Sequence, residues 1–421
     1  MRVLVVAVGT RGDVVPFLGL GTTLQAAGHE VTVAGYGMFA DLVAASGLAF
    51  RTLPGDPRTL GASEEGRQWQ RGGGGPRGVA RFVKLVAEHM RDVHAGILTA
   101  ARQDTDVLLV TGQAIFGGYH VAESLGLPSI GLALQPLHPT GRFPPPYLTT
   151  RSLGRPLNRA IGRAVLAKGT SALLKASVPL WADEGLPPFD ARAVLRRQQD
   201  TDWPVFYGFS PAVVPRPPDW RAGLRVVGYW WPDGPAGWTP PPELAAFLAA
   251  GPPPVFVGFG SRDPSDAARV DDVVAVARRE AGVRMVVQAG WAGLGGAAAG
   301  DDVITVGDVP HDWLFPRMSA VVHHGGAGTT AAGLLAGVPA VTVPLVIDQP
   351  FWGARLAACR VGPAPIPYRR LTGGTLADAI RTAVSEPAYR RRARELAAQV
   401  ARDDAATPVL EALDVLDASR S

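Results

Sequence analysis

The chain has 421 residues, too many for one compact core, and this length predicts two domains of roughly 200 residues each. Hydrophobic residues make up 47% and charged residues 19%, which excludes a disordered chain and predicts a globular one. The net charge is only +4 and the basic residues are spread out, so we expect no nucleic-acid partner; the single cysteine excludes an internal disulfide.

The first forty residues predict a β-α-β unit. Val3–Val8 is a continuous apolar run, as in a strand of a parallel sheet that is covered on both faces. A Gly-containing loop over 9–13 follows it. The helix expected over Pro16–Ala27 has its proline near the first turn and Gly28 just past its end. Glu30–Ala34 is the second expected strand.

Two irregular segments interrupt the rest of the first half. Residues 54–78 are rich in Gly, Arg and Pro and predict a long loop, of the kind that often serves as a lid or binding loop. Residues 138–156 are Pro-rich and also predict irregular structure. The regular elements expected between these segments are a helix over 79–101 and strands over 107–110 and 129–132.

No stretch of the chain approaches the ~18 apolar residues that a membrane span requires. The apolar run after Met1 is too short for a secretory signal. We therefore expect a cytoplasmic protein with no integral membrane span.

A segment rich in Pro and Trp, residues 211–242, predicts a domain boundary, and the α/β alternation restarts after it. The expected strands are 255–259, 284–288, 303–306, 320–323 and 340–343, and the expected helices are 266–281, 328–335 and 350–358. This layout predicts two facing Rossmann-like, doubly wound domains, which bind ligands outside the carboxyl ends of their strands. The expected division is a first domain over 1–214, a linker over 215–242, a second domain over 243–395, and a helix over 396–421 that packs back on the first domain.

The strongest chemical signal is the run HHGGAGTT over His323–Thr330, which follows an expected strand and opens a helix. Glycines let a backbone approach a ligand closely, and the N–H groups at a helix start bind phosphate oxygens. His324 and Thr329 can each donate one further hydrogen bond. The local pattern also fits a Gly-rich turn with a threonine cap.

Asp348 and Gln349 follow the next strand, at its carboxyl end, where they can face a ligand. A neighbouring carboxylate and amide offer the acceptors and donors that suit vicinal sugar hydroxyls. Taken alone, Asp348 fits equally well as the N-cap of a helix that begins near Pro350.

The stretch from Val306 through His324–Thr329 to Trp352 resembles the nucleotide-sugar signature of family 1 glycosyltransferases. The loop over Gly9–Pro16 is similar to that of their bacterial sterol and glycopeptide-antibiotic subgroup. The resemblance covers nearly the whole chain and implies the GT-B fold, with an acceptor-binding first domain and a second domain that binds the nucleotide sugar.

The same resemblance implies that His324 contacts the α-phosphate of the donor and that Asp348 and Gln349 hold sugar hydroxyls. The full set of implied donor-binding residues is Ser261, Val309, His324, Gly326, Gly328, Thr329, Asp348 and Gln349. Plant relatives carry a base-stacking Trp at the position of Asp308. This chain departs there, so the stacking residue stays open; Trp291 is one candidate, although a core or turn role fits it better.

Asp13 is the expected catalytic base. Many members of the family use a His in the first loop, but this loop has none, and the bacterial subgroup carries an Asp at the position of Asp13. A carboxylate there can take the proton of an acceptor hydroxyl. Thr10, Arg11 and Gly12 would line the same loop. Without the resemblance, Asp13 is better explained as a cap of the helix that begins near Pro16.

Two Asp-x-Asp triplets, over 104–106 and 200–202, are of the kind that holds Mn²⁺ or Mg²⁺ in other glycosyltransferases. Both precede a strand, at its amino end and away from the expected site, so we interpret them as solvated turn residues. The eight His include no HxH or HxxxH pair. We therefore expect no metal and no cofactor, with a helix N-terminus and His324 stabilising the leaving diphosphate.

These expectations describe an inverting, metal-independent glycosyltransferase. It would move a hexose from a UDP- or dTDP-sugar to a hydroxyl of a small, largely apolar acceptor, such as a natural product, sterol or antibiotic aglycone. A catalytically idle nucleotide-sugar-binding partner protein stays open as the alternative. A nicotinamide-dependent oxidoreductase is disfavoured because the loop over 9–13 lacks the GxGxxG pattern and Val33–Tyr36 provides no acid for a ribose.

Overall fold

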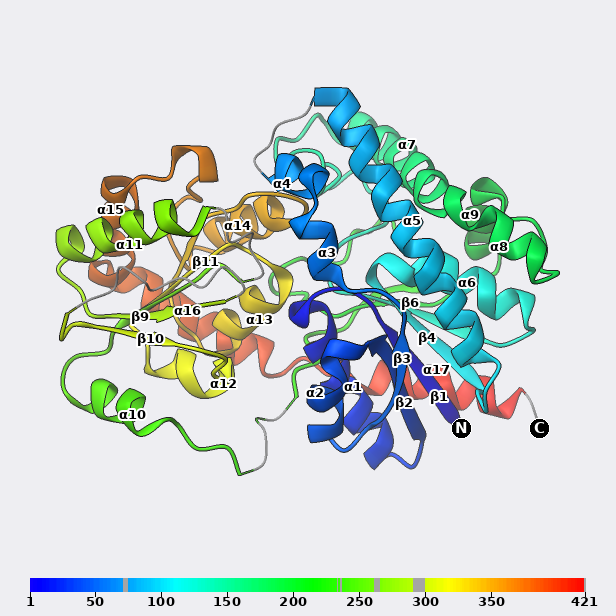
Figure 1. Cartoon of the computed structure of the whole chain (residues 1–421), viewed down its shortest axis with the longest axis horizontal. Coiled ribbons are helices and arrows are strands. Elements are labelled where there is room, and N and C mark those ends of the chain that lie inside the picture. Colours follow the sequence, from blue (N-terminus) through cyan, green and yellow to red (C-terminus); the bar gives the residue numbers. More distant parts are fainter. Residues whose placement is uncertain (71–74, 233, 235–236, 261–265, 291–299, 420–421) are drawn as a thin grey trace. The chain divides into compact units, whose positions relative to one another are not determined.

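The computed structural model describes residues 1–70, 75–232, 234, 237–260, 266–290 and 300–419. The chain divides into two compact units. The first unit comprises Met1–Pro232 together with Asp403–Ser421, and the second comprises Asp233–Arg402. Each unit contains its own parallel sheet with helices packed around it (Figure 1), which confirms the predicted α/β class.

The first unit is built on seven parallel strands in the order β3-β2-β1-β4-β5-β6-β7. They are β1 (Arg2–Ala7), β2 (Glu30–Tyr36), β3 (Ala49–Leu53), β4 (Val107–Thr111), β5 (Ser129–Ala133), β6 (Val205–Tyr207) and β7 (Leu224–Val226). β1 and β4 are buried along almost their whole length, which explains their continuous apolar sequence. The strand order reverses between β1 and β4, and doubly wound sheets bind ligands at such a switch point.

Helices cover both faces of this sheet. They are α1 (Arg11–Ala26), α2 (Ala40–Ala45), α3 (Pro57–Ala62), α4 (Glu64–Gln70), α5 (Gly75–Ala101), α6 (Ile115–Ser124), α7 (Arg155–Leu174), α8 (Val178–Asp183), α9 (Ala191–Asp200) and α17 (Thr407–Ala418). Figure 1 shows α1 and α2 on one side of the sheet and α5 and α6 on the other. Right-handed crossovers that leave β1 in one direction and β4 in the other produce this arrangement.

The first helix, α1, begins five residues earlier than predicted, at Arg11 instead of Pro16. The reason is local: Thr10 and Asp13 form a capping box, in which the Asp13 carboxylate accepts the Thr10 N–H at 2.9 Å. Pro16 therefore lies inside the helix, where it has no N–H to donate to the Gly12 carbonyl.

The prediction of a long loop over 54–78 is wrong, because this segment contains α3, α4 and the first turn of α5. Asp56 caps α3 by accepting the Arg58 N–H at 2.8 Å, and Pro57 occupies the first helical position. This Asp-Pro helix-start signal is present in the sequence. Residues 71–74 lie outside the described part of the chain. The irregular segment predicted over 138–156 is present, and it ends where α7 begins at Arg155.

The Pro- and Trp-rich segment up to Pro232 belongs to the first unit, with β7 as its edge strand, and Asp403–Ser421 belongs there too. Trp230 connects the two segments, since its Nε1–H donates to the Ala405 carbonyl at 2.7 Å. Gly228 lies beside the same contact, where a Cβ atom would come within 2.6 Å of Asp403 Cβ. The C-terminal segment is therefore attached to the first unit by specific backbone and ring contacts.

Gly228→Ala is expected to destabilise the first unit and release the C-terminal helix. The residue has a φ of +115°, so alanine adds a backbone strain of about 1–3 kcal/mol before any clash with Asp403. Urea unfolding and limited proteolysis of α17 measure the effect. Gly28→Ala is the matched control, because Gly28 also has a positive φ, +92°, but has nothing within 4 Å of its Cβ position. Equal losses in both variants would show that the contact with Asp403 does not contribute.

The second unit is built on five parallel strands in the order β10-β9-β8-β11-β12. They are β8 (Val255–Gly258), β9 (Met285–Gln288), β10 (Val303–Val306), β11 (Ala320–His323) and β12 (Ala340–Thr342). The helices are α10 (Pro242–Ala249), α11 (Ala267–Ala281), α12 (His311–Leu314), α13 (Ala327–Leu335), α14 (Gln349–Ala358), α15 (Gly373–Ser385) and α16 (Pro387–Val400). The five strands predicted in this unit, and the helices predicted over 266–281, 328–335 and 350–358, are all confirmed to within one residue.

Alternate residues of these strands, such as Val255 and Val257 of β8, pack with the apolar sides of α11 and α15 in one buried cluster. The switch point of this sheet lies between β8 and β11.

Candidate functional site

In the first unit, Asp13 lies in the first turn of α1, the helix that follows β1 at the switch point of the sheet. Its Oδ2 accepts the N–H of Thr10 at 2.9 Å and the Thr10 hydroxyl at 3.0 Å. Burial raises the pKa of Asp13, and the two hydrogen bonds from Thr10 offset part of that rise. A carboxylate with a raised pKa is a better proton acceptor than an exposed one.

Gly9 shapes the backbone around this carboxylate. It has a φ of +143°, and a Cβ atom at this position would lie 2.5 Å from Asp13 Oδ2. Only glycine leaves room for Asp13 to fold back over the loop. Asp13 does take part in capping, but as the third residue of a helix that begins at Arg11 and not as the cap of one that begins near Pro16, so a catalytic role would be additional to capping. Arg11 and Gly12, in the first turn of α1, are exposed, and Thr10 is partly buried.

A Tyr–His pair near Asp13 was not among the expected site residues. Tyr36 ends β2, beside β1, and its hydroxyl lies 2.7 Å from His89 Nε2 of α5. Burial raises the pKa of Tyr36 and the charge of Asp13 raises it further, so the phenol is neutral beside the carboxylate. Burial also lowers the pKa of His89. The contact spans 53 residues, and no local pattern indicates it.

In the second unit, the expected phosphate loop lies at the carboxyl ends of β8 and β11. The His324 imidazole is held between two glycines: a Cβ on Gly260 would lie 2.9 Å from its Cε1, and a Cβ on Gly326 would lie 2.4 Å from its Nε2. Gly325, with a φ of +86°, turns the backbone between them and approaches the Gln349 carbonyl. The structure thus brings together the strand end after β8, the HHGG turn and the start of α14.

The N-terminus of α13 points its first N–H groups into the same turn. Gly326 is the N-cap residue, no side chain caps the helix, and Gly328 and Thr329 lie in the first turn. An uncapped helix start of nine residues offers N–H donors and the positive end of the helix dipole to an anion.

His323, the residue before His324, was not predicted to take part. It is fully buried, and its Nδ1 accepts the Gly325 N–H at 3.1 Å. Burial, with the charges of His324 and His311, lowers the pKa of His323 to about 3. The ring is therefore neutral near pH 7 and can accept this bond. As the last residue of β11, His323 holds the turn that carries His324.

We expect His323→Phe to raise the donor KM about fivefold or more, with a smaller change in kcat. The variant keeps an aromatic ring but leaves the buried Gly325 N–H without its acceptor, at a cost of about 1–3 kcal/mol. His323→Asn places an amide oxygen near the position of Nδ1 and is expected to restore the KM. Initial-rate kinetics against donor concentration measure both variants. An unchanged KM in His323→Phe, or no rescue by asparagine, would rule out this positioning role.

Asp348 and Gln349 are both held by contacts near the start of α14. The Trp352 indole donates to Asp348 Oδ2 at 2.9 Å, while Gln349 Oε1 accepts the N–H groups of Leu345 and Val346 at 2.9 and 3.2 Å. Asp348 is the N-cap residue of α14, but its side chain makes no capping hydrogen bond. Because Oε1 is used within the loop, Gln349 would offer its Nε2 amide to a ligand.

Ile347 precedes these two residues in a strained conformation. Its φ is +60°, a region that β-branched residues rarely adopt, and its side chain is 45% exposed. Such strain tends to occur at functional loops. It is an independent indication that this turn serves a ligand.

The contacts described above do not include Val309, another residue expected in the second unit. Val309 is buried after β10. Two residues later, the centroid of the His311 ring lies 5.7 Å from that of Phe256 in β8. Ser261 and Trp291 lie outside the residues that the structure describes, so their predicted roles remain predictions.

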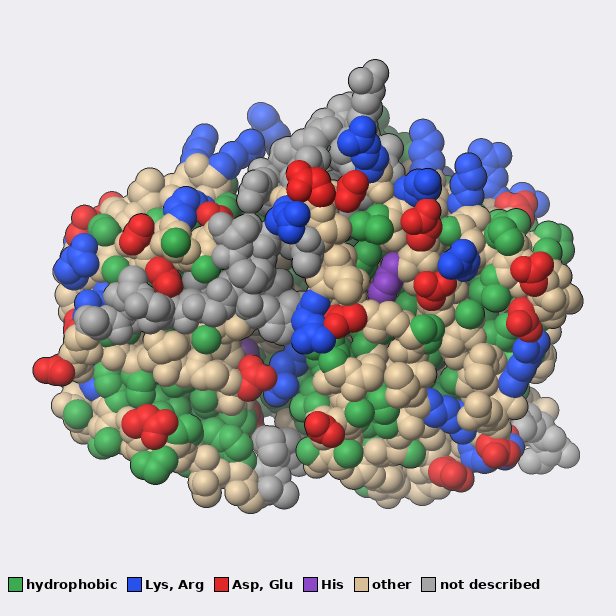
Figure 2. All heavy atoms as spheres, viewed as in Figure 1, with side chains coloured by type: hydrophobic (Ala, Val, Ile, Leu, Met, Phe, Trp, Pro, Cys, Tyr) green, Lys and Arg blue, Asp and Glu red, His purple; other side chains and the backbone are tan. Residues whose placement is uncertain are grey.

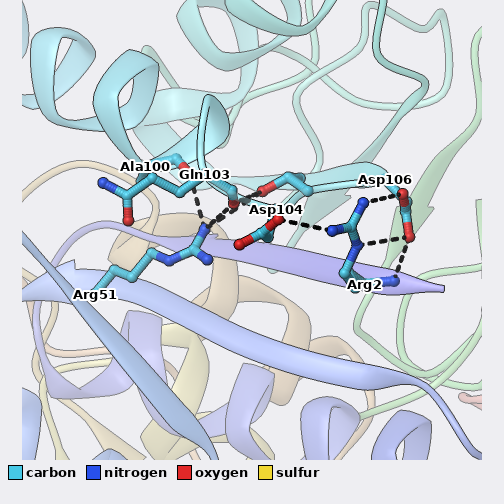
Figure 3. Close-up of polar contacts among 7 residues, drawn as sticks. Arg2, Arg51, Ala100, Gln103, Asp104 and Asp106 are labelled. Atoms are coloured by element: carbon cyan, nitrogen blue, oxygen red, sulfur yellow. Dashed lines mark hydrogen bonds and ion pairs between the residues drawn. The ribbon is translucent and has the colours of Figure 1, made fainter.

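The first Asp-x-Asp triplet is bound by an arginine at the amino ends of β1 and β4 (Figure 3). Arg2 contacts Asp104 at 2.9 Å and Asp106 at 3.0 Å, and its backbone N–H donates to Asp106 at 2.8 Å. Arg51 holds the same turn by donating to the Gln103 carbonyl at 2.7 Å. The triplet thus joins neighbouring strands, and only Asp104 fits the expected solvated turn, with a side chain that is 82% exposed.

The second triplet has a similar role. Asp202 accepts Arg221 Nη1 and the Gly223 N–H, both at 2.9 Å, and these contacts attach it to the segment before β7. The description of Asp202 as a merely solvated turn residue is therefore incomplete. Across the described ranges, no three His, Cys, Asp or Glu side chains gather as metal ligands would. In the same part of the chain, no helix is both long and apolar enough to cross a bilayer.

Two family profiles match the chain. Residues 3–137 match the family described as "Glycosyltransferase family 28 N-terminal domain". Residues 279–416 match "Erythromycin biosynthesis protein CIII-like, C-terminal domain". Together these matches include Asp13 and the whole HHGGAGTT run.

Known proteins are similar over almost the entire chain. O-mycaminosyltylonolide 6-deoxyallosyltransferase of Streptomyces fradiae is 36% identical over 96% of this chain and 94% of its own length. Sterol 3-beta-glucosyltransferase UGT80A2 of Arabidopsis thaliana is 34% identical over 90% of this chain, which spans only 60% of the length of that relative. The glycosyltransferase VinC, solved in complex with dTDP, superposes with a TM-score of 0.67 at 20% identity, over 100% of both chains. This superposition shows that the GT-B fold is shared.

Proposed function

This chain belongs to the family of glycosyltransferases that contains O-mycaminosyltylonolide 6-deoxyallosyltransferase, and on that premise we propose an inverting transfer of a hexose. The donor would be a UDP- or dTDP-sugar. The acceptor would be a hydroxyl of a small, largely apolar molecule, such as a sterol or an antibiotic aglycone. The first unit would bind the acceptor and the second unit the donor.

The observation that carries this proposal is the donor cradle of the second unit, formed by the N-terminus of α13 and by His324 between Gly260 and Gly326. Helix N–H groups and an imidazole N–H would bind the diphosphate oxygens. In the family to which the chain belongs, a diphosphate group leaves during transfer, and these donors would stabilise its developing charge. Asp348 and the Nε2 amide of Gln349 would hold the sugar hydroxyls.

The proposed reaction is a single displacement. Asp13 takes the proton of the acceptor hydroxyl while the hydroxyl oxygen forms a bond to the anomeric carbon. The bond from that carbon to the diphosphate oxygen breaks, and its electron pair leaves with the diphosphate. Because attack comes from the face opposite the leaving group, an α-linked donor gives a β-linked product. The raised pKa of Asp13 supports its assignment as the base.

We further propose that transfer requires no divalent metal. Both Asp-x-Asp triplets are already bound by arginines and precede their strands, whereas the proposed base Asp13 follows the carboxyl end of β1 in the same sheet. The cradle's N–H groups would supply the positive charge that a metal supplies in other enzymes. The proposal therefore predicts full activity in EDTA.

The test is turnover by the purified chain with UDP-glucose or dTDP-glucose, a panel of sterol, macrolide, aromatic and peptide acceptors, and EDTA. Mass spectrometry detects the added sugar, and the NMR coupling of its anomeric proton reports inversion. A β-linked product in EDTA supports the whole proposal. A product that requires Mn²⁺ or Mg²⁺ would refute the metal-free step, and an α-linked product would refute the single displacement.

A catalytically idle, nucleotide-sugar-binding protein is the alternative. It predicts that UDP or dTDP binds, as titration calorimetry would show, while no pair of donor and acceptor reacts and donor hydrolysis is absent. Failure of both nucleotides to bind would refute the proposed cradle itself.

A further inference from the structure

One segment of the first unit has a strongly one-sided charge. Residues 124–182 contain seven Lys or Arg residues and no Asp or Glu, although the net charge of all 421 residues is only +4. The cations are Arg142, Arg151, Arg155, Arg159, Arg163, Lys168 and Lys175. This segment departs from the even spread of charge that the composition of the whole chain suggests.

The same segment exposes large apolar side chains. Leu148 is 60% exposed, Leu157 56%, Leu153 41% and Tyr147 39%. Single exposed hydrophobics are ordinary on a protein surface, but a group of them rimmed by cations marks an interaction site. We call the surface of residues 147–168 the basic-apolar face.

This face is ordered by a buried side chain. Asn158 of α7 is 1% exposed; its Oδ1 accepts the Leu153 N–H at 2.9 Å, and its Nδ2 donates to Ser152 Oγ at 3.1 Å. Nδ2 also donates to the Gly141 carbonyl at 3.3 Å. The loop that carries Tyr147, Leu148 and Leu153 is thus attached to the helix that carries Leu157.

Cations and apolar side chains alternate along the chain here, since Arg151, Leu153, Arg155 and Leu157 are all exposed. Arg155, Arg159 and Arg163 recur every fourth residue and so form one stripe along the helix. Leu157 is exposed on another side of the same helix, because residues two positions apart do not face each other. Arg159 is partly neutralised by Asp219 at 3.9 Å. Figure 2 shows Lys and Arg side chains gathered at the border of the first unit over α7 and α9.

From this combination we propose that the basic-apolar face docks on an anionic lipid surface. Apolar side chains that enter the headgroup region, bordered by Lys and Arg, are the pattern of proteins that bind at membrane interfaces. A nucleic acid would use the cations but would give the exposed leucines no apolar partner. The missing acidic residues remove repulsion from negative lipids over the whole segment.

Docking here would also suit the proposed function, and only this consequence of docking rests on that function. The loop that carries Leu148 leaves β5 at its carboxyl end, and Asp13 follows β1 at the carboxyl edge of the same parallel sheet. An apolar acceptor dissolved in a bilayer would reach the first unit at the edge that contains its proposed base. The lipid-binding test below needs no turnover, so its outcome is independent of the proposed reaction.

The experiment is co-sedimentation of the full chain with vesicles of phosphatidylcholine alone or with about 30% phosphatidylglycerol. We expect binding to the anionic vesicles that weakens with added salt, and little binding to the neutral ones. The double variant Arg155→Glu/Arg163→Glu should bind at least about tenfold more weakly. Leu148→Gln/Leu157→Gln should also weaken binding, because it removes the apolar contact.

The matched control is Arg279→Glu/Arg391→Glu, which makes the same charge change at exposed sites of the second unit and should leave binding intact. Thermal melts confirm that all variants are folded. Absence of binding to anionic vesicles, or binding that neither double variant weakens, would overturn the proposal. A dimer in light scattering that the leucine variant dissociates would assign the face to a second copy of the chain instead.

Discussion

Asp13→Asn is expected to abolish sugar transfer while leaving the chain folded and able to bind a nucleotide. Asparagine keeps the size of the side chain and an oxygen that can accept the two hydrogen bonds from Thr10, so the start of α1 is preserved. It cannot take a proton from an acceptor hydroxyl. Loss of a general base typically costs about 10²–10⁴-fold in rate. The measurements are kcat with the best acceptor, the affinity for UDP or dTDP, and the thermal midpoint.

The pH dependence of the wild type tests the same residue. Asp13 acts as a base only when deprotonated, and burial raises its pKa above the ordinary value of 3.8. Activity should therefore fall as the pH decreases through that raised pKa. The Thr10 hydroxyl favours the charged form, so Thr10→Val should raise the pKa further and move this acid limb to higher pH.

Thr10→Val also serves as the control, since it alters the same loop without removing the carboxylate. We expect it to reach a substantial fraction of the wild-type rate at high pH, whereas Asp13→Asn stays inactive at every pH. If Asp13→Asn turned over at the wild-type rate, Asp13 would have only its capping role, and the base would lie elsewhere.

His324→Ala is expected to lower kcat/KM about 10²–10³-fold, the usual effect of removing one donor to a developing negative charge. The imidazole lies between Gly260 and Gly326, in the turn from which α13 starts, so its removal deletes a hydrogen-bond donor and leaves a void there. Binding of UDP and dTDP should weaken in parallel, because the proposed contact is to a phosphate that donor and product share. Titration with each nucleotide and initial-rate kinetics measure the two effects.

A second variant distinguishes the imidazole from the loop around it. Gly326→Ala would place a Cβ 2.4 Å from His324 Nε2 and displace the ring while keeping it. It should also impair donor binding. His29→Ala removes an imidazole of the first unit that has no proposed role and should leave kinetics unchanged. Wild-type nucleotide affinity in His324→Ala would contradict the phosphate contact.

Local sequence was sufficient where the physical cause is local. Strands buried on both faces have continuous apolar runs, which is why the strands predicted in both halves were found close to their observed bounds. The phosphate-binding turn was also predicted from the sequence. Gly325, Gly326 and the start of the helix that follows them all lie within one short run of residues. In the segment over 54–78, by contrast, the high Gly content obscured the Asp56-Pro57 signal that starts α3.

The parts of the site that the sequence missed depend on contacts between distant residues. His89 meets Tyr36 across 53 positions, and Arg2 reaches Asp106 across 104. Only the folded sheet places the amino ends of β1 and β4 side by side, so the sequence could not show that the first Asp-x-Asp triplet is bound by an arginine.

The sequence by itself determined the α/β class, the family resemblance, and the positions of Asp13 and the HHGGAGTT turn, because each rests on a short pattern with a local physical cause. Tertiary structure decided what surrounds them. It showed that Asp13 is held by Thr10 under Gly9, that a buried His323 supports the turn of His324, and that the leucines between the arginines of residues 151–159 are exposed. Burial and contact depend on packing between elements far apart in the chain, and no local pattern encodes that packing.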